Sequence, residues 1–310
     1  VTSCHFSGLY IQSSDGTFIR NNTFSSSGDH GIKLSSSHTT VIDNNTISSN
    51  TDYGIYVSSS ENLIVKSNSI SNNNDGIYIN NADDAIVSSN TVEDHGSFGL
   101  YFSDSKRLKV KKNIIEDNNG DALFLSSNCD NAFIDNNTIK NNGNSDSGKA
   151  LRLYQVDNTV IYNNTIESND YSGIVITSSN SNKIVDNTIK NNGKYGIGVT
   201  NEITRSANNT IKDNIINDNK DWAVYVNGIY TKVINNTIKY NEKDAIHISS
   251  EGARTTVQQN TIEDNEENAI HVVANNALII WNTIDGDTND NAILVIDSKS
   301  SSITNNTIEG

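Results

Sequence analysis

The sequence predicts an all-β fold, a solenoid of about 13 coils with three parallel sheets and an internal asparagine ladder. The main observation is a six-residue pattern, seen as Ile42-Asp43-Asn44-Asn45-Thr46-Ile47, that recurs thirteen times in 310 residues. A short period of 22 to 27 residues is typical of a solenoid, in which each repeat forms one coil. Every repeat keeps asparagine in the same slot, at Asn22, Asn45, Asn68, Asn90, Asn113, Asn137, Asn164, Asn187, Asn214, Asn236, Asn260, Asn282 and Asn306.

Two apolar positions flank this asparagine in every repeat and predict two short strands. Because most of these residues are β-branched, they favour strands, and the short interval between them predicts a tight corner. The first position lies three residues before the asparagine, at Ile19, Ile42, Val65, Val87, Val110, Ile134, Ile161, Ile184, Ile211, Val233, Val257, Ile279 and Ile303. The second lies two residues after it, at Phe24, Ile47, Ile70, Val92, Ile115, Ile139, Ile166, Ile189, Ile216, Ile238, Ile262, Ile284 and Ile308.

We interpret the repeated asparagine as structural rather than as a set of ligands. Asparagine tolerates the left-handed conformation and bonds its own backbone, so it suits the corner. Stacked coil on coil, its amide can also bond the same amide in the next coil. A second, less regular ladder follows the second strand, with Ser27, His95 and Asp287 in its other slots, at Asn50, Asn73, Asn118, Asn142, Asn169, Asn192, Asn219, Asn241 and Asn265.

A third strand in each coil begins with a small residue and an aliphatic one, as in Gly54-Ile55 and Ala122-Leu123. A further apolar residue two positions on, such as Val57, completes an alternation of period 2. Each coil then has three strands and three turns. Stacking such coils gives three parallel sheets around one narrow core.

Composition limits the partners of the protein. The net charge is -15, and an acidic surface repels nucleic acids and anionic membranes. No apolar stretch of about 18 residues is present, so we expect no membrane insertion.

Cys4 and Cys129 fall five coils apart, on the order of 24 Å at ~4.8 Å per strand. A disulfide cannot span that distance, and we predict that Cys129 is buried.

One repeat runs from end to end, so residues 1–310 are predicted to form a single solenoid domain. The sequence contains no Met, and neither end shows an atypical capping repeat. We therefore expect a segment of a longer protein, or a unit whose uncovered strand edges meet another copy.

With these repeats, the chain resembles the right-handed parallel β-helix proteins. These include pectate-lyase-like and polygalacturonase-like enzymes, mannuronan C5-epimerases, phage tailspikes, NosD-type proteins and many surface proteins. The resemblance covers nearly all residues and implies a single-stranded right-handed parallel β-helix, but it leaves the function open. In the enzymes of this family, the third-strand sheet lines the substrate groove.

Aromatic residues occupy the outward position of the third strand on successive coils, and we predict that they contact carbohydrate. Aromatic faces suit sugar rings because the CH groups of the sugar can lie on them. The alternative is cross-strand aromatic packing, which stabilises each pair by about 0.2–1 kcal/mol without a ligand. The predicted carbohydrate-binding residues are Tyr56, Tyr78, Tyr101, Phe124 and Tyr225.

Two groups of acid–base candidates lie beside these aromatic residues. A lyase or epimerase needs a base, an acid and a cation that neutralises the substrate carboxylate, and both groups contain suitable residue types. The Asp-Pro-His-Asp signature of the epimerases is absent, because the chain has no Pro. The alternative is a solvated set of charged residues. The candidates are Asp121, Lys149 and Arg152 in one group and Asp244, His247 and His271 in the other.

Four oxygen-bearing side chains alternate in one turn, at Asp285, Asp287, Asn289 and Asn291. This spacing is similar to that of EF-hand ligands, but the glycine and glutamate of an EF-hand are absent. We interpret the segment as an Asx-rich turn, with Ca²⁺ binding as the alternative. The sequence requires no cofactor.

Two outward features concern the surface. A strip of apolar residues at Phe18, Val41, Ile64 and Ile86 predicts an interface, covered by another segment or another copy. Asn-x-Thr sequons place their asparagine in a slot whose residue type varies, which indicates exposure to solvent and allows glycosylation of a secreted chain. These asparagines are Asn21, Asn44, Asn136, Asn163, Asn208, Asn235 and Asn305.

These features predict an extracellular or cell-surface β-helix with a structural or adhesive role, as a fibre or filament component. Its predicted partners are a polysaccharide or further copies of itself, joined end to end or laterally. The alternative is a polysaccharide lyase or C5-epimerase with its groove on the third-strand sheet. The regularity of the repeats favours the first, because a catalytic groove interrupts a solenoid with special residues.

Overall fold

The computed structural model describes residues 3–143, 148–286 and 290–309, and it confirms the predicted fold class. All the regular elements in these ranges are strands, and three strands recur thirteen times along the chain. The chain divides into two compact units, Val1–Thr159 (unit 1) and Val160–Gly310 (unit 2), and each is described by itself. Within the described ranges, no helix is long and apolar enough to cross a membrane.

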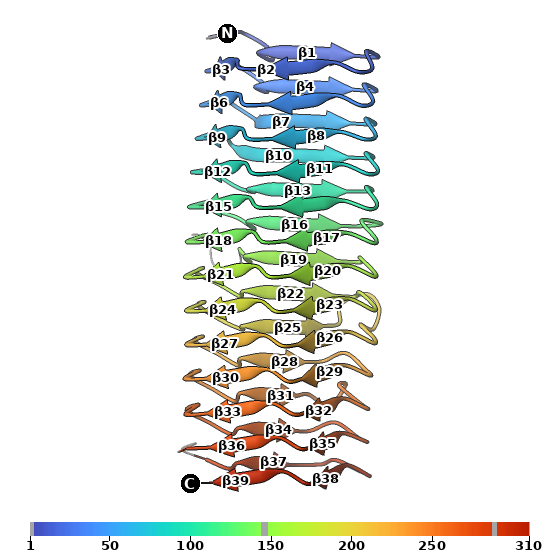
Figure 1. Ribbon diagram of the computed structural model, residues 1–310, viewed down its shortest axis with the longest axis vertical. Coiled ribbons are helices and arrows are strands. Elements are labelled where there is room, and N and C mark those ends of the chain that lie inside the picture. Colours follow the sequence, from blue (N-terminus) through green and yellow to red (C-terminus); the bar gives the residue numbers. More distant parts are fainter. Residues whose placement is uncertain (1–2, 144–147, 287–289, 310) are drawn as a thin grey trace. The chain divides into compact units, whose positions relative to one another are not determined.

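Unit 1 contains three parallel sheets, drawn from blue to green in Figure 1. The β1 sheet contains β1 (Leu9–Gln12), β4 (Ile32–Ser35), β7 (Tyr53–Ser58), β10 (Asp75–Asn80), β13 (Leu100–Ser103), β16 (Leu123–Ser126) and β19 (Leu151–Tyr154). The β2 sheet contains β2 (Phe18–Arg20), β5 (Val41–Asp43), β8 (Ile64–Lys66), β11 (Ile86–Ser88), β14 (Lys109–Lys111) and β17 (Phe133–Asp135). The β3 sheet contains β3 (Thr23–Ser25), β6 (Thr46–Ser48), β9 (Ser69–Ser71), β12 (Thr91–Glu93), β15 (Ile114–Glu116) and β18 (Thr138–Lys140).

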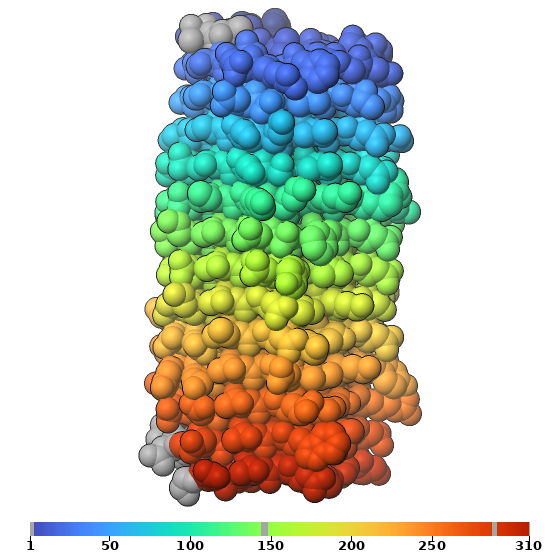
Figure 2. Space-filling view, in the orientation of Figure 1, coloured from blue at the N-terminus to red at the C-terminus, as the bar shows by residue number. Residues whose placement is uncertain are grey.

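Unit 2 repeats this arrangement, and Figure 2 shows the side chains of successive coils lying in layers. The β22 sheet contains β22 (Ile174–Thr177), β25 (Ile197–Thr200), β28 (Val224–Val226), β31 (Ile246–Ile248), β34 (Ile270–Val272) and β37 (Ile293–Val295). The β20 sheet contains β20 (Val160–Tyr162), β23 (Lys183–Val185), β26 (Thr210–Lys212), β29 (Lys232–Ile234), β32 (Thr256–Gln258), β35 (Leu278–Ile280) and β38 (Ser302–Thr304). The β21 sheet contains β21 (Thr165–Glu167), β24 (Thr188–Lys190), β27 (Ile215–Asn217), β30 (Thr237–Lys239), β33 (Thr261–Glu263), β36 (Thr283–Asp285) and β39 (Thr307–Glu309).

The core is a set of aliphatic columns in register. Ile42 pairs with Val65 on the next coil, and Ile47 pairs with Ile70, and all four side chains are fully buried. Since each column repeats one residue type at one strand spacing, the parallel register is the one that keeps every apolar side chain inside.

The asparagine ladder is confirmed and is a hydrogen-bonded column. In unit 1, Asn45 donates from its backbone N–H and from Nδ2 to Oδ1 of Asn68, at 2.9 and 3.0 Å. The same Nδ2 also donates to the carbonyl of Ile19 in the preceding coil, at 2.9 Å. Each amide therefore satisfies buried backbone groups of the preceding coil, which a corner otherwise leaves unpaired, and bonds the side-chain amide of the next coil.

The expectation that the ladder asparagine takes the left-handed conformation is wrong. Positive φ belongs to the residue before it, with 53° at Asn44, 56° at Lys112 and 55° at Trp281. The ladder side chain must point inward, so the preceding residue makes the turn and points outward. A non-glycine residue adopts this conformation at a cost of about 1–2 kcal/mol, and the ladder bonds offset that cost.

The second ladder follows the same plan one corner later. Asn118 donates from Nδ2 to Oδ1 of Asn142, at 2.9 Å, and His95 occupies one slot of this column. Asp287, the residue that replaces asparagine in the unit 2 part of this column, lies outside the described residues. Cys129 is fully buried as predicted, and Cys4 and Cys129 are both free thiols.

Candidate functional site

The outward face of the β1 sheet carries a second aromatic column beside the predicted one. Gly54 and Ile55 both point inward, so the residues on either side of them, Tyr53 and Tyr56, both face outward. A Cβ on Gly54 would lie 2.7 Å from Ile70 Cγ2, which explains why the inward slot takes a small residue. The strand thus begins with two inward residues, and strict alternation fails at this point.

Seven rings from these two columns form one continuous group on unit 1, which we term the unit 1 platform. Its members are His30, Tyr53, Tyr56, Tyr78, Phe98, Tyr101 and Phe124.

The rings of the platform contact one another from coil to coil. His30 stacks on Tyr56 with centroids 4.9 Å apart and an interplanar angle of 6°. Tyr78 and Tyr101 lie 5.0 Å apart, and Tyr101 stacks on Phe124 at 4.9 Å and 9°. Phe124 is only 9% exposed, so among the five predicted carbohydrate-binding residues it offers little surface, whereas Tyr56, Tyr78 and Tyr101 are partly exposed.

Two hydroxyl groups of the platform, those of Tyr53 and Tyr78, stay protonated at neutral pH. Burial, followed by the charges of Asp75 and Asp52, raises the pKa of Tyr53 to about 12. Burial also raises the pKa of Tyr78, whose hydroxyl lies 3.1 Å from Ser103 Oγ. The phenols can therefore donate hydrogen bonds to a ligand as well as offering ring faces.

Cations flank the platform. The ammonium of Lys33 lies 5.5 Å from the ring centroid of Tyr56, and the guanidinium of Arg152 lies 4.8 Å from that of Phe124. Both distances allow cation–π attraction, which holds these cations against the aromatic surface.

The structure brings the predicted residues Asp121, Lys149 and Arg152 together in unit 1. They line a hollow of about 230 Å³ together with Phe98 of the platform. Asp121 accepts the backbone N–H of Lys149 at 2.6 Å and lies 3.6 Å from the guanidinium of Arg152. Burial raises the pKa of Asp121, although both cationic neighbours oppose that rise. A buried carboxyl group beside cations and an open hollow is able to transfer a proton.

Unit 2 has its own aromatic group on the β22 sheet. Tyr195, Trp222 and Tyr225 stack with centroids 4.9 to 5.7 Å apart, and Trp222 also stacks on His247 at 4.3 Å. The ring of Tyr195 lies over Gly198, where an added Cβ would come within 3.0 Å of it. Tyr225 is thus part of an aromatic surface, as its place in the predicted column indicates.

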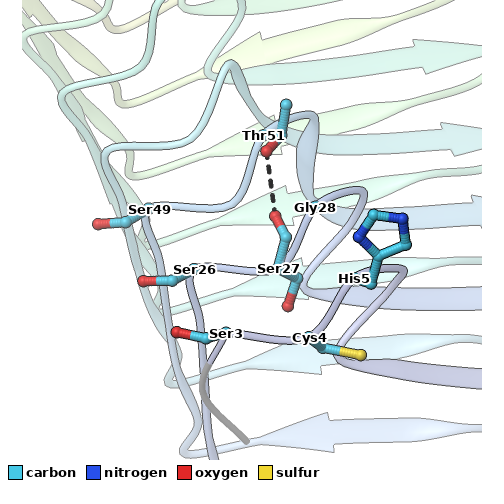
Figure 3. Close-up of a pocket in the computed structure, with 8 residues that line it drawn as sticks. All are labelled: Ser3, Cys4, His5, Ser26, Ser27, Gly28, Ser49 and Thr51. Atoms are coloured by element: carbon cyan, nitrogen blue, oxygen red, sulfur yellow. Dashed lines mark hydrogen bonds between the residues drawn. The ribbon is translucent and has the colours of Figure 1, made fainter.

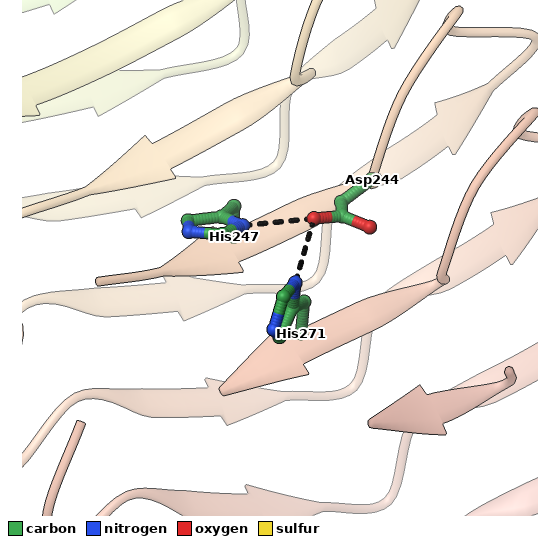
Figure 4. A group of neighbouring side chains, drawn as sticks. All are labelled: Asp244, His247 and His271. Atoms are coloured by element: carbon green, nitrogen blue, oxygen red, sulfur yellow. Dashed lines mark hydrogen bonds and ion pairs between the residues drawn. The ribbon is translucent and has the colours of Figure 1, made fainter. Parts of the chain in front are cut away.

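Asp244, His247 and His271 also converge in unit 2 (Figure 4). Oδ2 of Asp244 accepts from Nδ1 of His247 at 2.8 Å and from Nδ1 of His271 at 3.1 Å. Its other oxygen accepts two bonds from Asn268, at 3.0 and 2.7 Å. Burial would raise the pKa of Asp244, but the bonds from His247 and Asn268 hold that pKa below its usual range.

A hollow of about 440 Å³ lies at the first coil of unit 1 (Figure 3). The hydroxyl groups of Ser3, Ser26 and Ser49 point to the same side, away from the imidazole of His5. The lining includes Cys4 but no carboxylate, so it lacks the acid–base pair found near the platform.

The remaining predicted positions are found as follows. All seven sequon asparagines are exposed and have positive φ. Six of them directly precede an asparagine of the first ladder, whereas Asn208 precedes Asn209. The predicted apolar strip is a column in register, in which Phe18 pairs with Val41, Val41 with Ile64 and Ile64 with Ile86. Phe18 is 64% exposed. Self-association and glycosylation at these positions stay predictions.

The calcium prediction also stays open. Asp287 and Asn289 lie outside the described residues, and Asp285 and Asn291 are exposed. Asn291 donates from Nδ2 to Oδ1 of Asn268, at 3.1 Å.

Sequence analysis did not identify the second aromatic column, with Tyr53, Phe98, Tyr195 and Trp222. The signal was the residue immediately before each strand-opening Gly or Ala, which is aromatic in four coils. His30 occupies the same slot in an earlier coil.

Comparisons with known proteins agree with this architecture. The family described as "Right handed beta helix region" matches residues 7–148 and 149–308. The A-modules of two mannuronan C-5 epimerases from Azotobacter vinelandii are similar in structure. AlgE4 is 15% identical and aligns with 100% of this chain and 88% of its own, with a TM-score of 0.68. AlgE6 is 14% identical, with 97% and 91% covered and a TM-score of 0.70.

The Dettilon tailspike protein is 15% identical, with 92% of this chain and 61% of the tailspike covered and a TM-score of 0.58. At these identities the likeness shows the fold alone. No curated protein sequence matches the chain.

Proposed function

Because the chain belongs to the right-handed β-helix family, whose sheets present long outward faces, we propose that it binds an extended polysaccharide on the unit 1 platform. The observation that carries this proposal is the continuous group of seven rings on the unit 1 platform. Successive coils place a ring at each strand spacing of ~4.8 Å, so a chain of sugar rings can contact several coils at once.

The chemistry of the platform suits an uncharged or weakly charged glycan. Partly exposed rings offer apolar faces, while the Tyr53 and Tyr78 hydroxyl groups and the two flanking cations offer donors. The net charge of -15 opposes a strongly anionic polymer.

The similar structures include epimerases whose names give mannuronan as their substrate, which supports a polysaccharide as the ligand of this chain. We propose in addition that the chain acts outside the cytoplasm, as a structural or adhesive surface protein. Exposure of all seven sequon asparagines is consistent with a secreted chain.

Replacing Tyr78 or Tyr101 with alanine is expected to weaken retention on an immobilised neutral polysaccharide about tenfold, or ~1.4 kcal/mol. The reason is the loss of one ring face from the middle of the platform. Affinity electrophoresis on a panel of neutral and acidic polysaccharides measures it. The Tm should fall only modestly, because an aromatic pair contributes about 0.5–1.5 kcal/mol.

Phe133→Ala provides the matched control, since Phe133 is an exposed ring of unit 1 on β17, in the β2 sheet. Its retention should equal that of the unchanged protein. If the tyrosine variants lose stability but keep full retention, the rings serve only to pack.

A second candidate function is a polysaccharide lyase or epimerase, favoured by the buried Asp121 beside Arg152 and the 230 Å³ hollow. In that case Asp121→Asn abolishes turnover of a uronate polymer while polysaccharide retention persists, because the platform is intact. Reducing-end release and proton NMR of the product, with Ca²⁺ present, detect both reactions. Equal product from the variant and the unchanged protein excludes this carboxyl group as the catalytic acid.

A further inference from the structure

Three donor atoms from two consecutive coils of unit 2 converge on one point of the β22 sheet. Asp244 lies just before β31, His247 is on β31, and His271 is on β34. We infer that Asp244 Oδ2, His247 Nδ1 and His271 Nδ1 form a binding site for one divalent transition-metal ion of the Zn²⁺ type, with an open coordination position. This site is separate from the unit 1 platform and does not depend on carbohydrate binding.

Two of the three distances between the ligand atoms are close to those of a zinc site. Zinc holds nitrogen and oxygen ligands at about 2.0–2.2 Å, so two ligands of a tetrahedral site lie about 3.3 Å apart. The two distances to Asp244 Oδ2 are 2.8 Å from His247 Nδ1 and 3.1 Å from His271 Nδ1. In these two pairs, movements of a few tenths of an ångström, within the reach of side-chain rotation, convert the hydrogen-bonded distance into the distance between two zinc ligands.

Supporting residues already orient the ligands. The backbone N–H and Nδ2 of Asn268 both bond Oδ1 of Asp244, which leaves Oδ2 as the oxygen that faces the imidazoles. Trp222 stacks on His247 at 4.3 Å, and His271 meets His247 edge-on at 4.6 Å. Such outer contacts fix ring orientation at metal sites.

Both imidazoles already face the carboxylate, and the site is reachable from solvent. His247 and His271 each place Nδ1 on the same oxygen, Oδ2 of Asp244. The side chains of His247 and His271 are 14% and 19% exposed, so an ion has access from solvent.

Proton and charge balance permit the exchange. An imidazole that carries its proton on Nδ1 transfers that proton to Nε2, so the Nδ1 lone pair becomes available to the ion without net proton release. The carboxylate supplies one negative charge against the two positive charges of the ion. Lys243, the residue before Asp244, is already paired with Asp221 at 3.0 Å, while the carboxyl group of Glu267 adds negative charge nearby.

The donor set discriminates between ions. Imidazole nitrogen suits zinc, copper, iron and nickel, whereas calcium takes six to eight oxygen ligands. The site should therefore bind Zn²⁺ and reject Ca²⁺.

The test uses the whole chain without an affinity tag, freed of metal with a chelator and titrated with Zn²⁺ against a chromophoric competitor. We expect one equivalent to bind tightly, and Co²⁺ in its place to give the visible absorption of a four-coordinate site. His247→Gln and His271→Gln should each weaken binding at least 100-fold, because glutamine keeps a donor for Asp244 but lacks the imidazole ligand. Asn268→Ala should weaken it about tenfold.

His38→Gln is the matched control, since His38 lies in unit 1 outside the unit 1 platform and its Nδ1 accepts the backbone N–H of Glu61 at 3.2 Å. It should leave zinc binding unchanged. Circular dichroism and the Tm of each metal-free variant verify that the coils remain folded. The proposal is overturned if no zinc binds, if the His247→Gln and His271→Gln double variant still binds it, or if Ca²⁺ displaces it at equal concentration.

Discussion

Replacing Asn187 with alanine is expected to lower the free energy of unfolding by about 2–4 kcal/mol, since buried groups left unpaired cost about 1–3 kcal/mol each. In unit 2, Oδ1 of Asn187 accepts hydrogen bonds from the backbone N–H and from Nδ2 of Asn164, at 2.9 and 3.0 Å. Its own Nδ2 donates to the carbonyls of Ile161 and Val185, both at 3.0 Å, and to Oδ1 of Asn214 at 3.0 Å. Denaturant titration measures the loss.

Asn163→Gly is the control for this ladder variant. Asn163 is an exposed corner residue with φ of 52°, a conformation that glycine adopts readily. Its replacement should change the free energy of unfolding by less than about 0.5 kcal/mol. Equal losses in the two variants would mean that the inward amide does not carry the ladder.

Acid should destabilise the protein through His95, and His95→Asn should remove that sensitivity. The histidine is 1% exposed in the second ladder of unit 1, and burial lowers its pKa from 6.5 to about 4. The unfolded chain therefore binds a proton between these values that the folded chain rejects. The contribution of His95 to the free energy of unfolding is therefore complete above pH 6.5 and is lost as the pH falls toward 4. The loss is about 3 kcal/mol, at 1.36 kcal/mol per pKa unit.

The His95→Asn variant is compared with the unchanged protein by denaturant titration at pH 7 and pH 4. Asparagine is the residue of neighbouring slots Asn73 and Asn118, so it can continue the amide column. The stability difference between the variant and the unchanged protein should shift by about 3 kcal/mol in favour of the variant at pH 4. Other acidic groups titrate alike in both proteins, so their contributions cancel.

His5→Asn, at an exposed histidine of unit 1, is the control and should show no such shift. If the His95→Asn variant and the unchanged protein lose the same stability in acid, the burial of His95 does not govern the acid response.

The candidate sites were predicted unevenly. The outward column with Tyr78 and Tyr101 was predicted because the third strand alternates regularly after its first two residues. The neighbouring column with Tyr53 and Trp222 was not, because the strand begins with two inward residues and the period changes there. The structure brings the six acid–base candidates together in two groups of three, while their catalytic role stays a prediction. Their hydrogen bonds depend on rotamers that spacing does not determine.

The sequence by itself determined the number of coils, the three sheets and the inward asparagine. The reason is that the asparagine and the apolar positions recur thirteen times, and every repeat favours the same strand register. Only the tertiary structure decided which corner residue takes positive φ, since the inward ladder amide leaves the turn to its outward neighbour. It also decided that Asp244 receives both His247 and His271, which are 3 and 27 residues away. Parallel stacking places residues of adjacent coils one strand spacing apart, and side-chain reach across that spacing cannot be derived from separation along the chain.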